Sequence, residues 1–131
     1  MNKAFLTRPA ITAAFKQRFA YSTATDSGKY SYLVIAKDFT DPGCLERRMA
    51  VRNQHLVEIT EINKQGLVYV GGATLDSHES GKMTGSAIIA WSDSVEQLKD
   101  RIENDPYYKG KVWEKYEIYP YRIAIHGETK K

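Results

Sequence analysis

Alternating runs of apolar and polar positions divide the middle of the chain into short strands and two helices. The run KYSYLVIA at 29–36 is rich in aromatic and β-branched residues, which is typical of a largely buried strand. Further runs with strand character lie at 67–70, 84–91 and 112–125. The last of them contains Pro120, and proline favours an edge strand or a bulge because it cannot donate a ladder hydrogen bond.

Two helices are predicted between these strands. The first spans 43–63, and Thr40 or Asp41 is its expected N-cap. The second follows the capping residues at 92–94 and is stopped by Asn-Asp-Pro at 104–106.

The element order β-α-β-β-α-β predicts an α+β domain of the ferredoxin-like kind, in which both helices cover one face of an antiparallel sheet. Large apolar residues fall on both faces of the strands, among them Tyr32, Trp91 and Ile118. Because an uncovered sheet face would expose apolar surface, we expect a homodimer that buries it.

The distribution of charge separates a leader from this domain. Residues 1–25 contain four basic and no acidic residues, whereas the remainder contains 15 basic and 16 acidic residues. A basic segment rich in hydroxyl and small apolar residues is typical of a mitochondrial transit peptide. We therefore interpret 1–28 as a transit peptide for the mitochondrial matrix, or else as a disordered leader of a cytoplasmic protein. The domain is then 29–125, followed by a polar tail at 126–131.

Length and composition exclude several classes of protein. A chain of 131 residues holds one ordinary domain. Its single cysteine, Cys44, cannot form an internal disulfide or a thiolate zinc site of the usual spacing. No apolar run is long enough to span a bilayer, and the near-neutral domain has no basic stripe, so we expect neither membrane nor nucleic-acid binding.

A polar line along the first predicted helix is the strongest candidate site. Arg48, Arg52 and His55 are spaced i, i+4, i+7, so they stack along one ridge. At about 100° per residue the ridge falls within an apolar arc, which is formed by Leu45, Met49, Val51, Leu56, Ile59 and Ile62. Two guanidinium groups and an imidazole placed there need partners or a solvated cleft. Alternatively, both arginines extend to the helix edge and His55 is a structural residue.

Several motifs together resemble the YciI-like, or YCII-related, family. They are LERRMAVRNQHL at 45–56, Gly-Gly-Ala at 71–73, Thr-Gly-Ser-Ala at 84–87 and Asp-Pro-Tyr at 105–107. The resemblance covers 30–123. It implies a ferredoxin-like domain that dimerises into an α+β barrel, with a histidine and an aspartate proposed as an acid/base pair. One similar branch removes chloride from chlorinated hydroxyquinols.

The resemblance implies roles for particular residues. His55 matches the family histidine, and Asp105 is the expected carboxylate partner, with Asp76 as the alternative. In such a pair a neutral imidazole exchanges a proton near pH 7, while the carboxylate fixes its tautomer. Alternatively, Asp105 has no such role and is only the N-cap of the turn that begins at Pro106.

Other residues are candidates for contact with a ligand. Arg48 and Arg52 are expected to neutralise an anionic substrate, or else to form structural ion pairs. Ser86 is expected either to bind a substrate oxygen or only to begin its strand. Gly72 permits close approach of the backbone, and Asp76 follows in the adjoining loop.

These observations favour a small enzyme without metal or cofactor, a lyase or hydrolase that uses His55 as general acid or base on a small polar or aromatic metabolite. Two other hypotheses stay open. The chain is a dimeric ligand-binding or accessory protein without turnover, or it is a cofactor-free monooxygenase of the related α+β barrel type. In each case the expected partners are a small-molecule ligand and a second copy of the chain.

Overall fold

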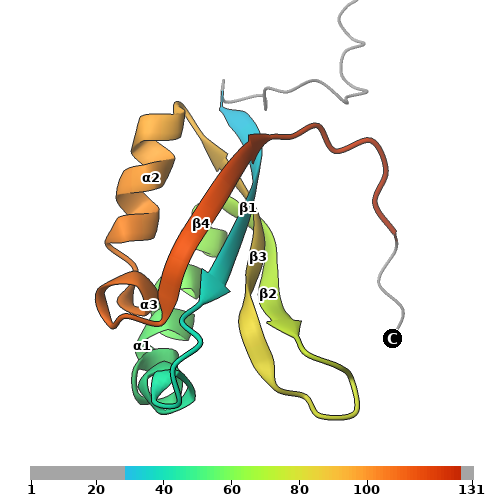
Figure 1. Cartoon of the computed structure of the whole chain (residues 1–131). Coiled ribbons are helices and arrows are strands. Elements are labelled where there is room, and N and C mark those ends of the chain that lie inside the picture. Colours follow the sequence, from blue (N-terminus) through green and yellow to red (C-terminus); the bar gives the residue numbers. More distant parts are fainter. Residues whose placement is uncertain (1–28, 128–131) are drawn as a thin grey trace, which may run out of the picture.

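Four strands and three helices lie within residues 29–127, the part of the chain that the computed structural model describes (Figure 1). The elements are β1 (Tyr30–Asp38), α1 (Cys44–Lys64), β2 (Val68–Leu75), β3 (Met83–Ser92), α2 (Val95–Glu103), α3 (Pro106–Lys109) and β4 (Trp113–Pro120). The predicted leader at 1–28 and most of the predicted tail lie outside the described residues. Within 29–127, no helix combines the length and apolar character needed to cross a bilayer.

The four strands form one sheet in the order β2-β3-β1-β4, and each neighbouring pair is antiparallel. β1 pairs with β3 from Tyr30 opposite Ser92 to Lys37 opposite Gly85. α1 and α2 pack on the same face of this sheet (Figure 1). The predicted ferredoxin-like α+β fold is therefore confirmed, whereas the homodimer stays a prediction. Pro120 ends β4, an edge strand, as its missing N–H favours.

The core lies between the sheet and the helices. Period-two alternation turns every second residue of β1 and β3 towards α1 and α2. The fully buried members of these four elements include Val34, Ala36, Ala90 and Leu98. Trp113 and Tyr107 close the end of the core near α3.

The beginning of α1 differs from the prediction. Thr40 or Asp41 was expected as N-cap, but the helix starts at Cys44, and its N-cap Gly43 makes no side-chain capping bond. The reason is that the Asp41 carboxylate has other partners. It accepts the Gly43 N–H at 3.1 Å and pairs with Arg47 at 2.7 and 2.8 Å, which closes a tight turn before the helix.

β2 is longer than predicted, because Gly71 and Gly72 continue the pairing with β3 opposite Ile88 and Ala87. The strand ends only at Leu75. In contrast, β4 ends before the predicted residue 125.

The second helix agrees better with its prediction. Ser94 caps α2 and accepts the Gln97 N–H at 3.2 Å. The Asn-Asp-Pro sequence does end α2, but it also begins the short helix α3, which was not predicted.

The buried face of α1 agrees with the predicted apolar arc only in part, because Val51, Ile59 and Ile62 pack against the core while the other three members are exposed. Leu45, Met49 and Leu56 are 47%, 54% and 40% exposed, whereas Arg48 and His55 are 2% and 7% exposed. The polar ridge replaces apolar side chains at the centre of the buried face because other elements supply partners for both residues. These partners form the candidate site.

Candidate functional site

A histidine and an aspartate meet between α1 and the start of α3. The Nδ1 atom of His55 lies 2.8 and 3.0 Å from the two carboxylate oxygens of Asp105. Their side chains are 9% and 11% exposed. Asp105 is also the N-cap of α3, where its Oδ1 accepts the Tyr107 N–H at 2.8 Å. One carboxylate thus makes both contacts that the sequence offered as alternatives.

Aromatic rings hold the imidazole in place. The His55 ring stacks on Tyr107 with centroids 3.9 Å apart and 17° between the planes. The Trp113 ring contacts it edge-on at 6.0 Å. Because Nδ1 faces Asp105, Nε2 is the ring nitrogen that does not contact this carboxylate. Burial raises the pKa of the Tyr107 hydroxyl, which keeps this neighbour neutral.

Arg48 forms a buried ion pair with Asp38 at the end of β1. Its Nη1 donates to both Asp38 oxygens at 2.9 and 2.7 Å. Its Nη2 donates to the Gly85 carbonyl and to Ser86 Oγ, both at 3.2 Å. Burial raises the pKa of Asp38, and the Arg48 charge opposes that shift. The ion-pair alternative for Arg48 is the one observed.

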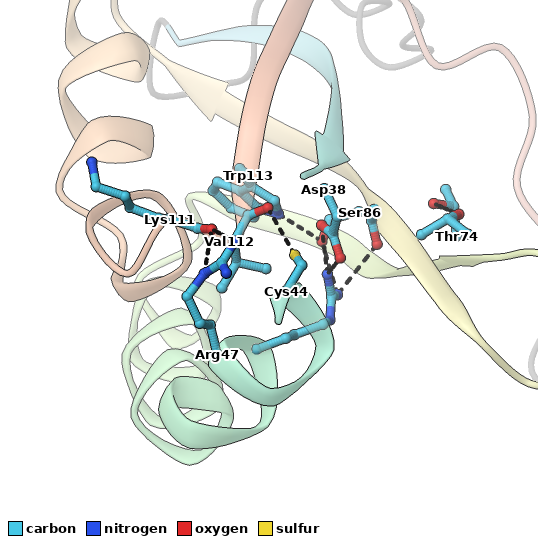
Figure 2. A network of polar contacts seen from close by, with 11 residues as sticks. Asp38, Cys44, Arg47, Thr74, Ser86, Lys111, Val112 and Trp113 are labelled. Atoms are coloured by element: carbon cyan, nitrogen blue, oxygen red, sulfur yellow. Dashed lines mark hydrogen bonds and ion pairs between the residues drawn. The ribbon is translucent and has the colours of Figure 1, made fainter. Parts of the chain in front are cut away.

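Ser86 connects this pair to the aromatic cluster. Figure 2 shows Asp38 and Ser86 approaching from β1 and β3, with the Trp113 ring bonded to Ser86. The Trp113 Nε1–H donates to Ser86 Oγ at 3.1 Å. Arg48 and Trp113 therefore share one hydroxyl acceptor in the core.

Of these groups, Arg48, His55, Ser86 and Tyr107 border a pocket of about 510 Å³ between α1 and the strands β2 and β3. Its lining includes five of the predicted residues, namely Arg48, Arg52, His55, Gly72 and Ser86. Apolar walls come from Leu56, Ile59, Val68 and Ile88. The structure thus brings together most of the site that the sequence predicted.

The two candidate carboxylates, Asp105 and Asp76, differ in their distance from His55 and this pocket. Asp105 lies behind His55 and reaches the pocket only through the imidazole. Asp76 is exposed after β2, where its backbone N–H donates to the Lys82 carbonyl, and it does not line the pocket. The described contacts of His55 thus include Asp105 and not Asp76.

Three neighbours of the site were not predicted to take part: Asp38, Tyr107 and Trp113. The sequence pattern could have indicated Asp38, because this charged residue continues the inward alternation of Val34 and Ala36. Tyr107 stood in the Asp-Pro-Tyr motif without an assigned contact. No local sequence pattern indicated Trp113, since its hydrogen bond to Ser86 joins residues far apart in the sequence.

Comparison with known proteins gives relatives that match this chain over 88 to 95 residues. Protein YciI of Escherichia coli O6:H1 is 30% identical over 95 residues, which cover 70% of this chain and 95% of that protein. A Haemophilus influenzae protein is 28% identical with the same coverage. The aspercryptin biosynthesis cluster protein B of Emericella nidulans is 26% identical over 88 residues, 63% of this chain and 55% of that protein.

A solved structure is similar in fold as well as in sequence. It is the 5-chloro-2-hydroxyhydroquinone dehydrochlorinase of Burkholderia phenoliruptrix in complex with 2,5-dihydroxybenzoquinone. The TM-score is 0.59 and the identity 27%, over 74% of this chain and 95% of that chain. The sequence model of the YCII-related domain matches residues 31–122, from β1 to just beyond β4. The chain therefore belongs to the YCII-related domain family.

Proposed function

We propose that this chain is a cofactor-independent lyase for a small polar or aromatic metabolite, with His55 as the general base and acid. The observation that carries the proposal is the 2.8 Å contact between His55 Nδ1 and Asp105, placed at the wall of a pocket of about 510 Å³. Pockets of roughly 300–1,000 Å³ suit small organic ligands.

The geometry supports a simple proton-transfer step. With Nδ1–H donated to Asp105, the Nε2 lone pair accepts a proton from the substrate, and the Asp105 carboxylate stabilises the imidazolium. In an elimination the leaving group departs with its bonding electrons, so the substrate loses one proton and one anion. The similar structure supports this reaction class, because that protein is named a dehydrochlorinase and holds a dihydroxybenzoquinone.

The proposal is tested on the full chain with 5-chloro-2-hydroxyhydroquinone, by following chloride release. We expect His55→Gln to lower kcat/KM by roughly 100-fold or more, as is usual for a lost general base. Asp105→Asn should lower it less, because asparagine can still cap α3 and accept the Nδ1–H.

The free energy of unfolding of each variant is the control. If His55 is instead a structural residue, His55→Gln should cost roughly 1–3 kcal/mol, and any loss of activity should follow the loss of stability. Wild-type protein that binds the hydroxyquinol but releases no chloride would contradict the lyase and favour the ligand-binding alternative.

A homodimer is part of the proposed function, because the sheet face opposite the helices carries exposed apolar side chains. Tyr69, Val70 and Tyr119 are 40%, 52% and 45% exposed. Val70 and Tyr119 lie opposite Ile89 and Leu33, which alternate with the buried residues of β3 and β1. A second copy packed on this face would remove that surface from water.

A further inference from the structure

We infer that the pocket takes its ligand as an oxyanion, and that Arg52 and Ser86 recognise it while Arg48 only positions Ser86. Arg52 supplies the charge, and the Ser86 hydroxyl donates a hydrogen bond to a ligand oxygen. The inference rests on the proposed function in one respect, since it names the substrate class of the same pocket.

Both terminal nitrogens of the Arg48 guanidinium already have partners. Nη1 is bonded to both oxygens of Asp38, and Nη2 to Gly85 and Ser86. The charge of Arg48 is matched by one carboxylate, and the side chain is only 3% exposed. Nε alone lacks an acceptor among the described residues, and it is buried. Arg48 therefore has neither spare charge nor an accessible donor for a ligand.

Arg52 has the opposite character. It is half-buried and lines the pocket, and its guanidinium has no hydrogen bond or ion pair to another residue in 29–127. No aspartate or glutamate is among the described residues that line the pocket. The nearby carboxylates of Asp38 and Asp105 face Arg48 and His55 instead. An uncompensated guanidinium in such a lining favours an anion, which it can bind through two parallel hydrogen bonds.

The environment of Ser86 decides the direction of its hydrogen bond to a ligand. A hydroxyl group has two acceptor lone pairs and one proton. The N–H groups of Trp113 and Arg48 occupy both lone pairs. The proton of Ser86 has no acceptor among the described residues, and the residue lines the pocket. Ser86 is therefore a donor to the ligand, which selects an oxygen with lone pairs and disfavours another donor.

The inference is tested by calorimetric titration of the full-chain protein with two probes. The first is 2,5-dihydroxybenzoquinone, whose acidic hydroxyl groups are ionised at neutral pH. The second is 2,5-dimethoxybenzoquinone, which has the same ring and no charge. We expect wild type to bind the anionic probe more tightly. Arg52→Gln should weaken that binding roughly 10- to 100-fold, the range for a lost charged hydrogen bond, and leave the neutral probe unchanged.

Three further variants sharpen the test. Arg52→Lys should recover part of the affinity, because it restores the charge without the planar fork. Ser86→Thr should retain binding and Ser86→Ala should weaken it, with unfolding measured because the alanine removes an acceptor from two buried donors. Arg47→Gln is the matched control: it removes another α1 arginine, one that faces Asp41 and Lys111 rather than the pocket, and should leave both affinities unchanged.

Equal affinity of wild type for the two probes, binding of neither, or an equal effect of Arg52→Gln on both would overturn the inference. These failures differ from failure of the proposed function. Anion binding that depends on Arg52, without any chloride release, would support the anion site and contradict the lyase proposal. Turnover that depends on His55, with an affinity for the anionic probe that does not depend on Arg52, would support the lyase proposal and contradict the anion site.

Discussion

The buried ion pair makes the effect of Asp38→Asn on stability predictable. The side chains of Arg48 and Asp38 are 3% and 6% exposed, and a guanidinium cannot shed its proton at any ordinary pH. The asparagine variant therefore leaves a full positive charge in the core. We expect it to lower the free energy of unfolding by roughly 3–5 kcal/mol, a large part of the ~5–15 kcal/mol that stabilises a typical domain.

Removing the other partner has a different pH dependence. In Arg48→Met the remaining carboxyl can take up a proton, and burial already raises its pKa above the ordinary value of 3.8. A carboxyl whose pKa is raised by folding contributes stability below its unfolded pKa and loses that contribution as pH rises through the folded pKa. Arg48→Met should therefore lose stability progressively above about pH 4, whereas Asp38→Asn should lack this dependence because it has no carboxyl at this position.

Urea unfolding followed by circular dichroism between pH 4 and 8 measures both effects. The matched control is Asp41→Asn, which breaks a bidentate pair of the same chemistry with Arg47 on the exposed side of α1. Water screens that pair, so its loss should matter much less. The reasoning is refuted if Asp38→Asn costs no more than Asp41→Asn, or if the deficit of Arg48→Met is independent of pH.

Other predictions follow from single features of the fold. Gly85→Ala should destabilise the domain by roughly 3 kcal/mol in urea unfolding, because a Cβ there collides with the Ala36 carbonyl oxygen; an unchanged midpoint would contradict this. Lys111→Gly should raise the melting temperature and add up to about 1 kcal/mol to the free energy of unfolding, since Lys111 has φ 61° and glycine adopts that angle without strain. A lower melting temperature would contradict strain at this position. Sedimentation at low micromolar concentration should give twice the chain mass, and a monomer would remove the basis for the barrel. Residues 1–28 fused to a fluorescent reporter should direct it to mitochondria, and diffuse cytosolic fluorescence would reject the transit peptide.

Much of the fold could be predicted because its signals are local. The β-branched run of β1, the Ser94 cap of α2 and the proline at the edge of β4 each depend on neighbours within a few residues. Their order along the chain was then enough for the fold class. Boundaries were predicted less well, as at Gly71 and Gly72, where local chemistry allows either a bend or continued pairing.

The buried face of α1 could be predicted only in part in this way. A helical projection places Leu45 and Met49 in the apolar arc. It does not show that other elements supply partners for the polar ridge, namely Asp38, Ser86 and Asp105. Those contacts join residues up to 50 positions apart. The resemblance to a family suggested His55 and Asp105; the residues themselves left Asp105 open between capping and pairing.

The double contact of Asp105 makes the histidine–aspartate geometry a matter of local folding as well as of charge. A helix of 4 residues such as α3 has little stability of its own, so the turn is held by packing and by the Asp105 cap. Whenever that turn opens, the Tyr107 amide proton is released to solvent and the carboxylate is free to leave His55. Hydrogen exchange at a single amide, that of Tyr107, would therefore report how often the cap opens and leaves the carboxylate free to move from His55, with no ligand needed in the assay.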